Sequence, residues 1–213
     1  ELNFATDTNS KMIVDTMVVS HDGTLTIGTE DNPVQGNVDV DIVIANNGAI
    51  DTAWDPTLIS RGIISLGTTK IHGQEKTTHL KVASDPGIND MSITLAEAPV
   101  NWEVGDTIVL AGTRYDGYRY TNNPDNNVHF PPQDEVLTIT AIDGAVLSFE
   151  TELQDTKLQY DHGTPRADLK TSVANYTRNV SIETEGGSAA QTHERGHVMF
   201  MHSDNVSVKY AEF

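Results

Sequence analysis

The residues best suited to chemistry gather between positions 160 and 202. Four of the chain's eight histidines lie in this stretch: His162, His193, His197 and His202. Histidine is the usual acid–base group near neutral pH and a common metal ligand. The stretch therefore predicts a polar site at which protons are moved or a charged ligand is bound.

We expect His162, Arg166, His197 and His202 to line one polar groove. A histidine there would act as general acid or base, and Arg166 would hold a carboxylate or hydroxyl of the substrate through paired hydrogen bonds. The alternative is that these side chains form a buried polar network that stiffens this part of the chain. Both interpretations stay open at the level of sequence.

Strand geometry limits what this histidine pair can do. Residues 197–202 have the pattern of a strand, so His197, Met199 and Met201 share one face. His202 falls on the opposite face, with Val198 and Phe200, unless the chain bends there. The pair cannot chelate one metal ion from a straight strand, and a turn at residues 203–204 would be needed to bring His202 back to the site.

A second candidate region is the long connection from Arg114 to Gln133, which has no strand pattern. Connections of this length are usually functional or disordered, and this one is rich in rings. We expect its rings, together with Arg195, to bind substrate, and the expected substrate-binding residues are Tyr115, Tyr118, Tyr120, His129 and Arg195.

The elements that must position these residues are strands. Short β-rich segments alternate with Gly, Asn and Asp turns, and no segment keeps a helical period over three turns. The clearest segments are 12–19, 24–27, 38–45, 135–142 with 145–149 as a hairpin, 180–183, 197–202 and 206–210. The steps Asn179-Val180 and Asn205-Val206 suggest successive coils of a parallel β-helix. Trp102, before Gly105-Asp106, is expected to be a core aromatic under a turn.

Composition excludes several classes of function. The net charge of −18 opposes binding to phosphate backbones, so we expect no nucleic-acid partner, and it weakly disfavours strongly anionic polysaccharides. The absence of cysteine excludes disulfides and thiolate zinc sites. No apolar run is long enough to cross a membrane. No cofactor or metal is expected; calcium is the one ion left open, at Asp39 and Asp41, where a solvated strand face is the stronger interpretation.

Four ordered segments resemble the G8 domain family. Residues 23–33 read GTLTIGTEDNP, residues 61–67 and 71–73 read RGIISLG and IHG, and residues 100–110 read VNWEVGDTIVL. Residues 178–180 and 196–201, RNV and GHVMFM, resemble the junction of that family with a following β-helix. The segment before Gly23 is shorter than the corresponding segment of the family, and the connection 114–133 is longer.

The resemblance implies an all-β fold, a G8 β-sandwich or β-roll module running into a right-handed parallel β-helix. The implied division is a G8 domain over residues 1–155 and the first coils of a truncated β-helix over 156–213. It also implies a secreted or cell-surface polysaccharide-processing protein, related to hyaluronidase-like proteins, and the missing cysteines favour a bacterial source. The implied partners are a polysaccharide and the rest of a longer β-helix. The open alternatives are the groove wall of a glycosidase or polysaccharide lyase, a non-catalytic glycan-binding or adhesive module, and a purely structural segment.

Overall fold

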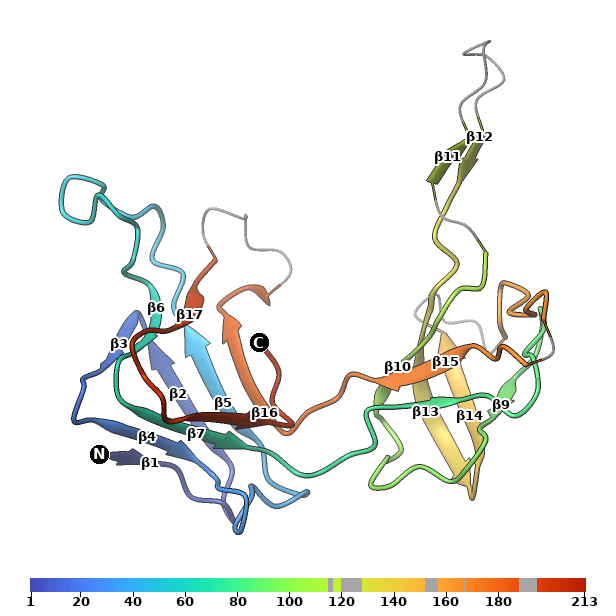
Figure 1. The fold of residues 1–213 in the computed structure, drawn as a ribbon, viewed down its shortest axis with the longest axis horizontal. Helices are drawn as coiled ribbons and strands as arrows, with labels where there is room; N and C mark the ends of the chain where they lie inside the picture. The colour runs from blue at the N-terminus through green and yellow to red at the C-terminus, as the bar shows by residue number, and fades with distance from the viewer. Residues whose placement is uncertain (115–116, 120–127, 152–156, 167, 188–194) are drawn as a thin grey trace. The chain divides into compact units, whose positions relative to one another are not determined.

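The structure is a computed structural model that describes residues 1–114, 117–119, 128–151, 157–166, 168–187 and 195–213. All elements in this part of the chain are β-strands (Figure 1), which confirms the expected all-β class. The chain divides into two compact units. Unit 1 comprises Glu1–Glu75 and Arg178–Phe213, and unit 2 comprises Lys76–Thr177.

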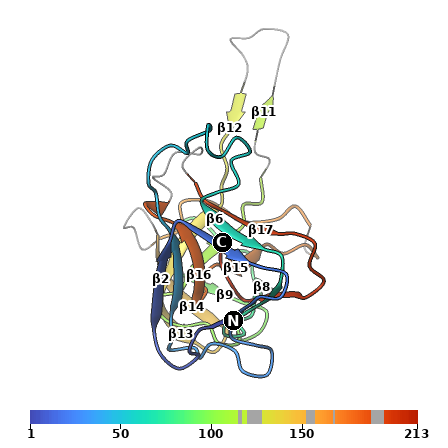
Figure 2. The same ribbon diagram turned by 90° about the vertical axis from the view of Figure 1, so that its left-hand side faces the viewer.

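Unit 1 is a parallel β-solenoid built from three sheets (Figures 1 and 2). Three turns of the chain, here called rungs, each give one strand to each sheet. Rung 1 consists of β2 (Ser10–Val14), β3 (Thr16–Val19) and β4 (Thr24–Ile27). Rung 2 consists of β5 (Val40–Ile44), β6 (Gly62–Ser65) and β7 (Thr68–His72). Rung 3 consists of β16 (Val180–Thr184), β17 (His197–Phe200) and β18 (Val206–Lys209).

The rungs are stacked in register, so equivalent residues lie above one another. Met17, Ile63 and Val198 form one such column, and all three pack in the core. The inward positions of the three sheets are mostly apolar and merge into one buried core, and the inward hydroxyls of Ser65 and Thr69 bond to each other at 2.7 Å. Burial of one isoleucine side chain stabilises the folded state by about 1.5–3 kcal/mol relative to leaving it in water. β1 (Leu2–Asn3) pairs with β4 before rung 1, and Glu212 forms a bridge with Ser181 after rung 3.

Glycine is required where backbones of neighbouring rungs approach closely. A Cβ atom built on Gly62, the first residue of β6, would lie 2.2 Å from the carbonyl oxygen of His197 in rung 3. A Cβ on Gly67 would lie 2.2 Å from the carbonyl oxygen of Ser20 in rung 1. Both positions lie at strand ends, where the sequence pattern predicts close backbone approach.

Unit 2 is an antiparallel sheet in the order β8-β15-β10-β13-β14-β9. Its strands are β8 (His79–Lys81), β9 (Ser92–Thr94), β10 (Thr107–Leu110), β13 (Glu135–Asp143), β14 (Val146–Thr151) and β15 (Ser172–Asn175). A bridge between Val82 and Leu95 joins the two edges, so the sheet curls around its own apolar core. β11 (Gly117–Arg119) and β12 (Val128–Phe130) form a separate hairpin. The predicted hairpin at 135–149 is confirmed, and Trp102 is buried as expected.

The solenoid begins earlier in the chain than the sequence suggested. Rungs 1 and 2 already occupy residues 10–72, whereas the expected boundary at residue 155 falls inside unit 2. The reason is that unit 2 is inserted between rungs 2 and 3, and its last strand, β15, pairs with β10 rather than with the solenoid. The two Asn-Val steps begin β16 and β18, which belong to different sheets of the same rung and not to successive coils.

Candidate functional site

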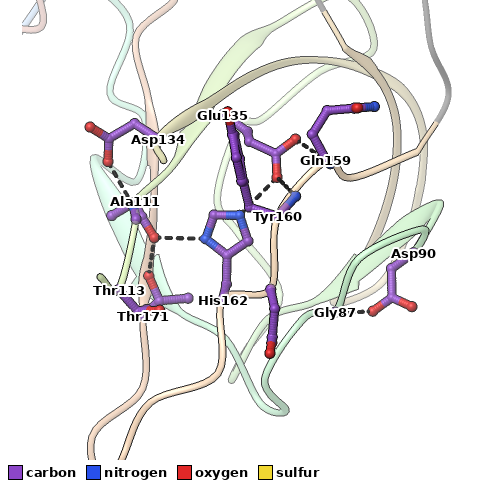
Figure 3. Close-up of polar contacts among 12 residues, drawn as sticks. Gly87, Asp90, Ala111, Thr113, Asp134, Glu135, Gln159, Tyr160, His162 and Thr171 are labelled. Atoms are coloured by element: carbon purple, nitrogen blue, oxygen red, sulfur yellow. Dashed lines mark hydrogen bonds and ion pairs between the residues drawn. The ribbon is translucent and has the colours of Figure 1, made fainter. Parts of the chain in front are cut away.

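His162 lies in the interior of unit 2, where it has no solvent exposure. Figure 3 shows its ring between two acceptors. Nδ1 lies 3.0 Å from the carbonyl oxygen of Ala111, and Nε2 lies 2.8 Å from Oε1 of Glu135. Glu135 also accepts the backbone N–H groups of Gln159 and Tyr160, at 2.8 and 3.1 Å.

The hydrogen-bond roles around His162 define a structural pair. A carbonyl oxygen can only accept, so Nδ1 donates to Ala111. Nε2 and Oε1 of Glu135 share one proton in the second hydrogen bond, and Glu135 also accepts two backbone amide protons. The result is a buried hydrogen-bonded pair that ties the segment around residue 160 to β13. His162 therefore does not line an open groove, because a fully enclosed ring cannot touch a polymer.

Sequence reasoning missed Glu135 as the partner of His162. A signal was present, because Glu135 occupies the same face of β13 as Leu137 and Ile139, both of which are buried. A carboxylate at an inward position of a strand needs a charged or hydrogen-bonding partner.

Arg166 is on the surface of unit 2. Its guanidinium forms two hydrogen bonds with Asp168, at 3.0 and 2.5 Å, and these bonds lower the pKa of Asp168. His162 and Arg166 belong to unit 2, whereas His197 and His202 belong to unit 1. Neither unit by itself therefore contains the expected four-residue groove.

His197 is the first residue of β17 and is half-buried, on the strand face opposite Val198. Its register partners in the lower rungs are Gly62 and Thr16, while the next residue, Val198, packs against the core above Ile63. Nε2 of His197 is enclosed, and no hydrogen-bond partner reaches it within the described part of the chain. His202 lies beyond the end of β17 with a left-handed φ of 50°, so the chain does bend there, and its side chain is exposed.

His197 also lines an open cavity of about 600 Å³ at rung 3. Its polar lining comes from four further side chains: Glu183, Thr184, Arg195 and Glu212. Partial burial raises the pKa of Glu212; the charge of Glu183 adds to this effect and that of Arg178 opposes it. The cavity thus brings a base, a guanidinium and two carboxyl groups together with apolar walls such as Phe200 and Ile182.

The aromatic connection is only partly within the described residues. Tyr118 and His129 occupy opposite positions in the hairpin of β11 and β12. Tyr115 and Tyr120 lie outside the described residues, as does His193. The substrate-binding role expected for this connection stays a prediction.

An exposed tryptophan in unit 1 was not identified from the sequence. Trp54 is 75 % exposed and lies in the loop of residues 45–61 that joins β5 to β6. Leu58 and Ile59, in the same loop, are also exposed. The available signal was position: Trp54 stands between Asp51 and Asp55-Pro56, outside any strand pattern, where a core tryptophan is not expected.

Side-chain hydrogen bonds hold this loop in place. Near its start, the backbone N–H of Asn46 donates to Glu185 at 3.1 Å and the Asn47 amide donates to Asp15 at 2.7 Å. Beyond Trp54, Asp55 accepts the hydroxyl and the backbone N–H of Ser60 at 2.6 and 2.8 Å. These two bonds lower the pKa of Asp55 to about 2.

No metal site is evident in the ranges that the structure describes, where no three His, Asp or Glu side chains are grouped suitably. Asp41, one of the two residues considered for calcium, instead accepts a hydrogen bond from Ser181 at 2.8 Å. The same ranges contain no helix that is long and apolar enough to cross a membrane.

Comparison with known proteins agrees with the sequence motifs in the first part of the chain. Residues 1–83 match the family model of the G8 domain. These residues form a G8 domain. In the structure, this G8 domain contains rungs 1 and 2 of the solenoid.

Two proteins of Dictyostelium discoideum, both described as G8 domain-containing, resemble nearly the whole chain. One is 31 % identical over 194 residues, which cover 84 % of this chain and 16 % of that protein. The other is 25 % identical over 197 residues, which cover 90 % of this chain and 13 % of that protein. The chain therefore spans only about one sixth or less of the length of these relatives.

Among solved structures, phage tailspikes are similar at a low level. The Gp54 tailspike of Acinetobacter baumannii bacteriophage AP22, in complex with capsular saccharide, aligns with a TM-score of 0.32 and 14 % identity over 83 % of this chain and 23 % of that chain. The tailspike gp49 of Pseudomonas phage LKA1 aligns with a TM-score of 0.33 and 14 % identity over 79 % of this chain and 25 % of that chain.

Proposed function

We propose that this chain binds a polysaccharide as part of a longer secreted or cell-surface β-solenoid protein. The observation that carries the proposal is Trp54, an indole that is 75 % exposed on a loop whose two ends are hydrogen-bonded to other segments of unit 1, through Asn46 to Glu185 and through Arg61 to Thr16. An exposed aromatic ring offers a flat apolar face with a polar edge, which suits the apolar face of a sugar ring.

The polar groups available for sugar hydroxyls lie near the two ends of the Trp54 loop. The two ends of its loop contact segments next to the rung 3 cavity: Asn46 bonds to Glu185, and the carbonyl of Arg61 accepts the backbone N–H of His197. Arg195, Glu183 and His197 line that cavity. A few polar side chains within an otherwise apolar cavity are typical of ligand sites.

The charge of the chain favours a neutral polysaccharide. With 31 acidic and 13 basic residues, the surface repels polyanions at moderate ionic strength. We therefore expect binding to neutral glycans to exceed binding to uronate-rich or sulfated ones, with the difference growing as salt is lowered.

The test is affinity electrophoresis of the whole chain in gels that contain neutral or anionic polysaccharides. We expect Trp54→Ala to weaken binding at least about fivefold, since stacking of a ring on an aromatic face contributes on the order of 1–3 kcal/mol. Tyr176→Ala is the matched control, because Tyr176 is also a strongly exposed aromatic but belongs to unit 2. Absence of retardation in every gel, or equal retardation of wild type and Trp54→Ala, would contradict the proposal.

A catalytic form of this function is the second candidate, and one observation favours it. His197 and two carboxyl groups, one with a raised pKa, share the rung 3 cavity. Such a set can supply the acid and base of glycosidic bond cleavage. The same polysaccharides, incubated with the protein and assayed for new reducing ends, distinguish the two: products that disappear in His197→Ala support catalysis, and unchanged polymer supports binding alone.

A further inference from the structure

Three polar side chains meet in the interior of unit 2: Lys76, Asp106 and Asn175. Their exposed fractions are 6, 4 and 1 %. Nζ of Lys76 donates to Oδ1 of Asp106 at 2.8 Å, and Nδ2 of Asn175 donates to Oδ2 of the same carboxylate at 2.7 Å. One carboxylate thus holds an amine on one oxygen and a carboxamide on the other.

Neighbouring contacts fix this group from all sides. The backbone N–H of Glu103 donates to Oδ2 of Asp106 at 2.9 Å, and Oδ1 of Asn175 accepts the backbone N–H of Thr177 at 2.9 Å. The buried indole of Trp102 donates to the carbonyl oxygen of Thr77 at 2.6 Å, next to Lys76. The amine and the carboxamide are thus both hydrogen-bonded to one carboxylate, whose own position is fixed by a backbone contact.

We propose that Lys76 and Asn175 form an intramolecular amide bond, with Asp106 as the proton carrier. A proton passes from the Lys76 ammonium group to Asp106 along their hydrogen bond. The free amine then attacks Cγ of Asn175, and an N–C bond forms. Asp106 returns its proton to the carboxamide nitrogen and takes one from the attacking nitrogen; the Cγ–Nδ2 bond breaks, and ammonia leaves. A lysine ammonium, an aspartate and an asparagine amide become one secondary amide, one neutral aspartic acid and one ammonia, so atoms and charge balance without a cofactor.

Burial favours each part of this reaction. Moving the proton from Lys76 to Asp106 replaces two buried charges by two neutral groups, which a water-poor interior prefers. Exclusion of water also protects the amide from hydrolysis. Holding both reactants on one carboxylate replaces a bimolecular encounter by a step within one site.

The positions of the two residues give the bond a clear consequence. Lys76 is the first residue of unit 2, and Asn175 ends β15, two residues before the unit ends at Thr177. The amide would therefore join the two ends of the inserted unit covalently. In a chain without cysteine, no disulfide can do this.

The test is the intact mass of the whole purified chain, followed by peptide mapping under denaturing conditions. We expect a mass about 17 Da below that of the sequence, through loss of ammonia, and a branched peptide joining Lys76 to Asn175. A mass equal to that of the sequence overturns the proposal. A deficit of about 18 Da with a branch from Lys76 to Asp106 also overturns it, since that product arises by loss of water from a different pair.

Variants then assign the roles. Lys76→Arg keeps a positive charge but removes the nucleophile, and Asp106→Ala removes the proton carrier; both should restore the full mass. Lys81→Arg, on the neighbouring strand β8, is the matched control and should keep the deficit. The wild-type mass decides the question even if Asp106→Ala does not fold, and a deficit that survives in Lys76→Arg contradicts the assignment.

Discussion

The pair of His162 and Glu135 holds a segment without strand pattern against the sheet of unit 2. Two polar groups buried together are stable only while both remain, because removal of one leaves the other without a hydrogen-bond partner in a place that water does not reach. The surface pair of Arg166 and Asp168 differs in this respect, since water replaces either partner at little cost. Loss of His162 should therefore destabilise unit 2 more than loss of Arg166, although the sequence predicted both residues in one groove.

We expect His162→Ala to lower the free energy of unfolding of unit 2 by about 2–4 kcal/mol, because it leaves a cavity and removes one hydrogen-bond partner from the buried Glu135 carboxyl group. Arg166→Ala should change it by at most about 1 kcal/mol. Urea denaturation of the wild-type and variant chains measures both values. Similar losses for the two variants would contradict the structural role of the buried pair.

For single residues, the sequence predicted the features that depend only on nearby positions in the chain, such as the face of a strand on which a side chain lies. Strand alternation placed Val198 toward the core, and the turn pattern placed Trp102 in the core. It could not predict the contact between His162 and Glu135, because those residues lie on different segments of unit 2 and only the curling of the sheet brings them together.

At the scale of elements, the solenoid depends on close contact between rungs at their corners. β2 and β3 turn at the single residue Asp15, without glycine, and the alternation of residues 12–19 therefore predicted one strand where there are two. β4 has the predicted bounds, because Gly23 and Gly28 flank it with clear turn signals. A corner without glycine, proline or asparagine is therefore difficult to predict from the sequence.

Gly62→Ala should weaken the contact of rung 2 with rung 3. The added Cβ would lie 2.2 Å from the His197 carbonyl oxygen, so the strands must separate locally, at a cost of about 1–3 kcal/mol. Gly87→Ala is the control, because its Cβ would find the nearest atom only at 3.8 Å. Thermal unfolding of the two variants gives the comparison, and equal melting temperatures would argue against tight stacking at this corner.

At the scale of the molecule, unit 2 is an independent body of structure within the sequence of the solenoid. It has its own apolar core, and its sheet uses no strand of unit 1. The periodicity of the chain predicted strands in both units but not their separation, because parallel and antiparallel partners are chosen by contacts distant in sequence. Pairing of β5 with β16 is the clearest case, since all of unit 2 lies between them.

Residues 76–177 expressed alone should fold cooperatively. All the hydrogen-bonded neighbours of their strands, and the cluster around Trp102, lie within these bounds. A sigmoidal urea transition with dispersed amide resonances in a proton–nitrogen correlation spectrum is the expected result. A spectrum without dispersion would show that the unit needs the solenoid in order to fold.

The insertion also has a consequence for the order of events during synthesis. During synthesis, β5 of rung 2 is complete before β16 has been made, so its backbone hydrogen-bonding groups on that side remain unpaired. An unpaired strand edge can pair with other chains. In the finished unit 1, the backbone N–H of Gln74 donates to the Asn179 side chain at 2.8 Å, so the departing and returning segments end side by side. If unit 2 collapses first, the remaining gap to be closed is short and its entropic cost is small. The inserted unit would thus act as an internal folding aid, which shortens the time that an unfinished solenoid spends with its edge exposed.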